Sequence, residues 1–148
     1  MTPMAGLDER LGLAMRLGLV EGRWDDALSE VRLTLVDHSS SAKALLALAV
    51  CYFHRREFVE AITWLDQAAE RAKRNAGQPG DAPWAAIHLF RGLAYAARRA
   101  PAAARADFAE LRAFDPAPIR WEQFKDVLRP DELARARLAA EAAGLPGG

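Results

Sequence analysis

The chain has 148 residues, the size of one ordinary domain, and its 20 basic and 20 acidic side chains give a formal net charge of zero. No excess charge is available to attract nucleic acid or an anionic membrane, so we expect neither as a partner. The single cysteine, Cys51, excludes an intramolecular disulfide and suits a reducing compartment. The longest apolar run, residues 44–53, has about half the length of a membrane-spanning helix, which excludes membrane insertion.

The composition and the first residues favour a cytoplasmic protein from a bacterium. Only three of the 20 basic residues are lysines, and alanine is abundant from Ala42 onward, a bias typical of a GC-rich genome. Asp8 and Glu9 precede any apolar stretch, whereas a secretory signal begins with a basic segment and continues with an apolar one. We therefore expect a soluble, cytoplasmic chain that folds as a single domain over residues 1–148.

Helical periodicity extends along the whole chain, because leucine and alanine recur at intervals of three and four residues. No stretch alternates apolar and polar residues in the way that predicts strands. Gly22 breaks the first helix, Ser41 can cap the third, and Pro101 suits the first turn of a later one. We predict an all-α fold with helices over residues 7–21, 24–37, 41–54, 58–74, 83–98, 101–113, 119–128 and 130–143.

The helices repeat at a fixed period, which predicts helical pairs that stack on one another. Trp24 and Ala27 recur 34 residues later as Phe58 and Ala61. The period then lengthens to 43 residues, because residues 76–84 are inserted between the second repeat and the third. The pairs that show the longer period are Tyr52 with Tyr95 and Ala61 with Ala104.

These residues resemble the pattern of the tetratricopeptide repeat (TPR) family, which places a small residue, an aromatic, an alanine and a proline at set offsets. The second repeat follows the pattern most closely, whereas the first has Met15 at the small position and Gly18 at the aromatic one. The resemblance implies a right-handed superhelix of three TPR-like helix pairs plus C-terminal capping helices. The repeats cover about residues 8–41, 42–75 and 85–118, and the cap covers 119–143.

The third predicted helix carries the main functional signal, because residues 44–53 are apolar on every side and must be covered on every side. In TPR proteins the first helix of each pair lines a concave groove. The resemblance therefore implies a partner-binding groove lined by Arg16, Leu19, Leu46, Val50, Phe53, His54, Leu89, Phe90 and Leu93. One subset of the family binds acidic C-terminal tails at offsets that hold Gly12, Arg16, Ala47, Ala86 and Phe90 here. These supply one cation and no amide, so an apolar ligand fits the groove better than an acidic tail.

We expect a protein-protein interaction module, an adaptor or assembly chaperone that holds an apolar helix or extended segment of another protein in this groove. A self-associating structural protein is the alternative, with a second copy of the chain covering the same residues. The C-terminal helices are a third possible cover for the groove. The sequence does not choose among these occupants.

No residue pattern predicts chemistry. Phosphate-binding, metalloprotease and serine-hydrolase motifs are absent, and no second ligand or nucleophile stands beside His38, His54 or His88 at helical spacing. The arginine pairs 55–56 and 98–99 either form a basic edge or stabilise helix C-termini. We therefore expect no enzymatic activity, no metal and no cofactor.

Overall fold

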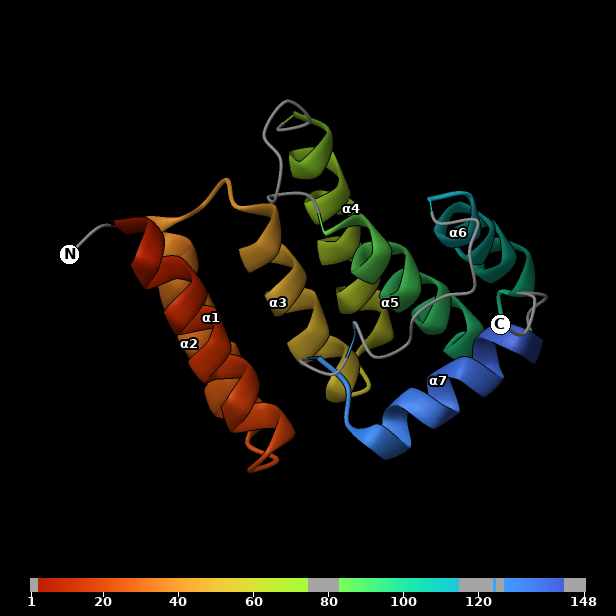
Figure 1. Cartoon of the computed structure of the whole chain (residues 1–148), viewed down its shortest axis with the longest axis horizontal. Helices are drawn as coiled ribbons and strands as arrows, with labels where there is room; N and C mark the ends of the chain where they lie inside the picture. Colours follow the sequence, from red (N-terminus) through yellow and green to blue (C-terminus); the bar gives the residue numbers. More distant parts are fainter. Residues whose placement is uncertain (1–2, 75–82, 115–123, 125–126, 143–148) are drawn as a thin grey trace. The chain divides into compact units, whose positions relative to one another are not determined.

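The computed structural model is built from helices (Figure 1). It describes residues 3–74, 83–114, 124 and 127–142, and within these ranges it contains seven α-helices and no strand. The predicted all-α class is confirmed. The chain divides into two compact units, Met1–Pro83 and Trp84–Gly148, which are described in turn. The single domain and the superhelix of three pairs stay predictions.

The first unit consists of two helical hairpins. They are formed by α1 (Pro3–Leu19) with α2 (Trp24–Asp37) and by α3 (Ala42–His54) with α4 (Phe58–Arg74). The α3 helix packs against α4 on one side and against α1 and α2 on another. All nine residues from Ala44 to Tyr52 are buried. The helix that contains the apolar run, α3, is thus the most thoroughly buried helix of this unit.

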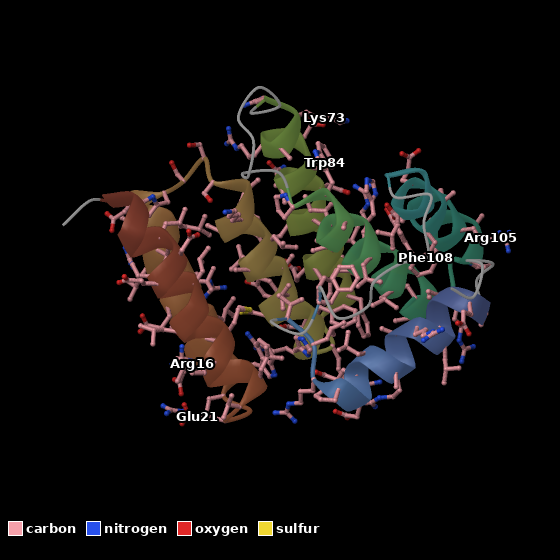
Figure 2. The ribbon with its side chains drawn as sticks, viewed as in Figure 1. Arg16, Glu21, Lys73, Trp84, Arg105 and Phe108 are labelled. Atoms are coloured by element: carbon pink, nitrogen blue, oxygen red, sulfur yellow. The ribbon has the colours of Figure 1, made fainter. Side chains whose placement is uncertain are left out.

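The second unit contains α5 (Trp84–Ala97), α6 (Pro101–Phe114) and α7 (Pro130–Ala142), and α5 packs against both of the others. Gly92 allows α6 to approach closely, because a Cβ atom there would lie 2.6 Å from the ring of Phe108. Figure 2 shows Phe108 at this contact between α5 and α6. On α7, Ala136 and Ala140 are buried.

The predicted helices and the observed ones agree closely in position. The largest difference is at α1, which begins at Pro3 rather than at residue 7. The predicted helix over 119–128 lies for the most part outside the described residues, and Val127 and Leu128 form a turn whose N–H groups donate to the carbonyl of Phe124. The predicted insertion 76–84 also lies outside them except at its end, where Trp84 is the first residue of α5.

A residue with a positive φ angle lies in the turn of each of the three hairpins, although in the first the closing hydrogen bond runs from Arg23 N–H to the Leu17 carbonyl. Gly22, Arg56 and Arg99 have positive φ angles of 69°, 64° and 60°, and they are 34 and 43 residues apart. In the second and third hairpins an equivalent hydrogen bond closes the turn at 2.9 Å, from Glu57 N–H to the Tyr52 carbonyl and from Ala100 N–H to the Tyr95 carbonyl. The periods found in the sequence therefore mark structurally equivalent turns.

Gly18 explains how the first hairpin departs from the TPR pattern. A Cβ atom at this position would lie 2.3 Å from the indole of Trp24, so the ring of α2 lies directly on the backbone of α1. Trp24 occupies the space that a side chain at position 18 would need. The aromatic ring that α1 lacks at position 18 is thus replaced by the indole of α2, which fills the same space.

Two glycines of α1 give a matched test of this packing. Gly18→Ala should lower the free energy of unfolding by about 1–3 kcal/mol, because the new methyl group overpacks the contact with Trp24. Gly12 has no atom within 4 Å of its virtual Cβ, so Gly12→Ala should raise the free energy by up to about 1 kcal/mol through helix propensity. Urea unfolding followed by circular dichroism measures both, and equal effects would contradict the packing.

Burial on α3 also changes the chemistry of the single thiol. Cys51 has no exposed surface, and burial raises the pKa of its thiol to about 12, partly offset by the charge of Arg55. The neutral thiol is favoured in the folded state, so its contribution to stability is complete below the unfolded value of about 8.5 and is lost as pH rises towards the folded value.

This pKa predicts an alkaline loss of stability that depends on Cys51. Between pH 8 and pH 10, the free energy of unfolding of the wild type should fall by about 2 kcal/mol more than that of Cys51→Ala. Urea unfolding of both proteins at the two pH values measures the difference. Parallel pH dependences would show that the thiol ionises as easily in the folded chain as in the unfolded one.

Candidate functional site

The structure separates the nine predicted groove residues into buried and accessible ones. Six lie on α1 and α3 of the first unit, and three lie on α5 of the second. Arg16 is exposed, and Leu19, Phe53 and His54 are half-buried. The other five are buried and are not open surface in this structure: Leu46, Val50, Leu89, Phe90 and Leu93.

The four accessible residues all belong to the first unit. Arg16 and Leu19 are in the last turn of α1, and Phe53 and His54 end α3. The two helices pack against each other and run in the same direction, so their C-terminal ends lie at the same end of the unit (Figure 1). This end of the unit is the candidate functional site.

An aromatic cluster of Trp24, Phe53, His54 and Phe58 forms part of this site. The ring of His54 stacks on Trp24 with centroids 4.1 Å apart and planes 5° from parallel. Phe53 meets the rings of His54 and Phe58 edge to face, each at 5.6 Å. All four residues are half-buried, so the cluster combines fixed ring positions with accessible apolar surface.

Ion pairs hold the backbone beside the aromatic cluster. Nε of Arg55 lies 3.2 Å from a carboxylate oxygen of Asp25 and 3.2 Å from one of Glu57. Asp25 belongs to α2, so these contacts tie the end of α3 to the preceding hairpin. Arg56 occupies the left-handed turn. The arginine pair 55–56 therefore serves the packing and the turn at this end of α3.

A second polar group, unforeseen at the sequence level, lies inside the α5/α6 hairpin. Oδ1 of the buried Asp107 lies 3.0 Å from Nδ1 of His88 and accepts a hydrogen bond of 2.9 Å from Nε of Arg91. Trp84 stacks beside the His88 ring with centroids 6.0 Å apart. A buried carboxylate with two such partners is satisfied, so the group contributes to packing specificity between α5 and α6.

The repeat spacing contained the signal for this group. His88 and Arg91 lie 43 residues after Leu45 and Leu48, so polar side chains replace leucines at packing positions. Such a replacement predicts a buried partner, because an unpaired polar group is costly inside a hairpin. The sequence did not predict which residue is the partner, because Asp107 is 19 residues from His88 and belongs to another helix.

The second unit also has an open apolar hollow of about 500 Å³. Its lining consists of small side chains and one cation, contributed by α5, α6 and α7: Ala96, Arg99, Pro101, Ala104, Ala139 and Ala142. A catalytic pocket needs several converging titratable groups, and this lining supplies one.

Within residues 3–74, 83–114, 124 and 127–142, no three His, Cys, Asp or Glu side chains gather as metal ligands would. None of the helices in these ranges is long and apolar enough to span a membrane.

The fold and the site define an all-α protein of helical hairpins with a half-exposed aromatic cluster. Comparisons of the chain with protein-family models, with curated proteins and with solved structures find no match. The function must therefore be argued from the chain's own surfaces.

The buried carboxylate of the α5/α6 hairpin gives a stability test. Asp107→Ala should lower the free energy of unfolding by about 2–3 kcal/mol, because it leaves His88 and Arg91 without their acceptor. Asp131→Ala is the control, since Asp131 pairs with Arg135 on the surface of α7 and its removal should change stability little. Equal losses in the two variants would refute a role for the buried group in packing.

Proposed function

We propose that the chain is a protein-binding module, an adaptor or assembly chaperone, whose hairpins stack in the TPR manner. Two features support the stacking. The turns of the three hairpins share a left-handed residue at the repeat spacing. Ala27, Ala61 and Ala104, which are related by the same spacing, are fully buried on the second helix of each hairpin. Small residues at such positions allow helices to approach closely.

The accessible part of the predicted groove is the proposed partner-binding surface. It is formed by Arg16 and Leu19 of α1 and by Phe53 and His54 of α3. The observation that carries the proposal is the aromatic cluster, because rings held in place but half-exposed are typical of the central residues of protein interfaces. The ligand is an apolar helix or extended segment of another protein, with Arg16 at its edge.

The buried groove residues limit where that segment binds. Leu46 and Val50 belong to the covered part of α3, so the proposed contact is at the C-terminal end of α3 and not along its length. A bacterial cytoplasm suits the module, because Cys51 is a single buried thiol and the composition is arginine-rich.

A double variant at the accessible residues tests the function. Leu19→Asp with His54→Ser should weaken binding of a co-purifying partner by tenfold or more, about 1.4 kcal/mol, by placing a charge on the apolar contact and removing a stacked ring. The measurement is affinity capture with mass spectrometry, followed by titration of the purified partner.

Val59→Asp is the matched control, since Val59 is an exposed apolar residue of α4 outside the proposed surface. The control should bind like the wild type. A double variant that folds and keeps wild-type affinity for every captured partner would refute the proposed surface.

A further inference from the structure

One side of α3 faces the preceding hairpin. His54 stacks on Trp24 of α2, and Ala47 and Cys51 lie on the same side of α3 as His54 at helical spacing. Both Ala47 and Cys51 are buried. The side of α3 defined by positions 47, 51 and 54 is therefore the side that receives another helical hairpin.

The equivalent side of α1 is apolar but uncovered. Positions 34 residues before 47, 51 and 54 hold Leu13, Leu17 and Val20. Leu13 is 57% exposed and Val20 is 74% exposed, whereas Leu17 is half-buried. The main contacts of α1 are with α2 and α3, and the exposure of Leu13 and Val20 shows that these contacts leave this side open. Large apolar residues of α1 thus occupy the positions that are equivalent to those through which α3 contacts the preceding hairpin.

Two charges on this side of α1 form no ion pair within the part of the chain that the structure describes. Glu9 and Arg16 flank Leu13 at helical spacing, and neither forms an ion pair among the described residues. The neighbouring Arg10 does, through Asp37 of α2 at 2.9 Å. Figure 2 shows Arg16 on the outer surface of α1. The outer side of α1 therefore carries one unpaired charge of each sign around an exposed leucine.

We propose that two copies of the chain associate through this outer face, defined by Glu9, Leu13 and Arg16 of α1 and by Val20 directly after the helix. In a two-fold antiparallel contact centred between Gly12 and Leu13, Glu9 of each copy lies opposite Arg16 of the other, because the two positions are equally far from that centre. The leucines meet at the axis. A chain of zero net charge adds no overall repulsion between copies.

The expected strength follows from the size of the contact. One helix packed on one helix buries less than the roughly 1,200 Å² of a standard protein interface. We therefore expect a dissociation constant of tens of micromolar, on the order of −6 kcal/mol, rather than a permanent dimer. Sedimentation equilibrium of the full chain over about 5–500 µM covers this range.

The first test of dimerisation compares the mass of the wild type in solution with that of two leucine variants. The average mass of the wild type should rise from 16.2 kDa and approach twice that value at the highest concentrations. Leu13→Glu should raise the dissociation constant at least tenfold, about 1.4 kcal/mol. Leu138→Glu should leave it unchanged, because Leu138 is a similarly exposed leucine, 66%, on α7. A wild type that stays monomeric, or a Leu13→Glu variant that still dimerises fully, overturns the proposal.

A charge exchange tests the antiparallel geometry. Glu9→Arg and Arg16→Glu should each weaken the dimer, because like charges then face each other across the contact. The double variant Glu9→Arg with Arg16→Glu should restore wild-type association. Circular dichroism confirms that each variant is folded, and failure of the double variant to recover association overturns the pairing.

This inference shares only Arg16 with the proposed function, and variants at the other residues test the two separately. Leu19→Asp with His54→Ser leaves the α1 outer face intact, so that variant should still dimerise. Leu13→Glu leaves the aromatic cluster intact and should still bind a partner. If a different protein, and not a second copy, occupies the outer face of α1, the purified chain stays monomeric at 500 µM, about ten times the expected dissociation constant, and the proposal fails.

Discussion

The covering of α3 on every side is the constraint on which the first unit depends. Residues 44–53 have no polar side on which the helix could meet water, so α3 must pack against both its own hairpin partner and the preceding hairpin. That requirement brings the end of α3 against Trp24 and sets the positions of Phe53 and His54. The candidate site is thus a consequence of the packing of the core.

Much of the fold was predictable because its signals are local. Gly22 ends one helix and Pro101 begins another through their own backbone preferences, independently of distant residues. The 34-residue period relates turns that each contain a residue with a positive φ angle. The site was less predictable, because an apolar helix does not show which neighbour covers each side. For this reason the sequence predicts Leu46 and Val50 as groove residues, whereas both are buried in the structure.

Contacts between helices were the least visible in the sequence. In the first repeat, Gly18 departs from the aromatic residue of the TPR pattern. The structure shows that the indole of Trp24, from the opposite helix of the hairpin, fills the space beside it. The sequence predicts a solitary packing role for His88, whereas in the structure its ring meets the carboxylate of Asp107 on the other helix of the hairpin. In both cases the missing information was the register between two helices, which the spacing of residues within one helix does not contain.

Native-state hydrogen exchange, resolved by peptide mass spectrometry, tests the central claim most directly. If α3 is held by neighbours on every side, amides of residues 44–52 should exchange only through global unfolding and should be the slowest in the first unit. Amides of α1, which has an exposed outer face, should open locally and exchange faster. Exchange of residues 44–52 that is as fast as that of α1 would contradict the account.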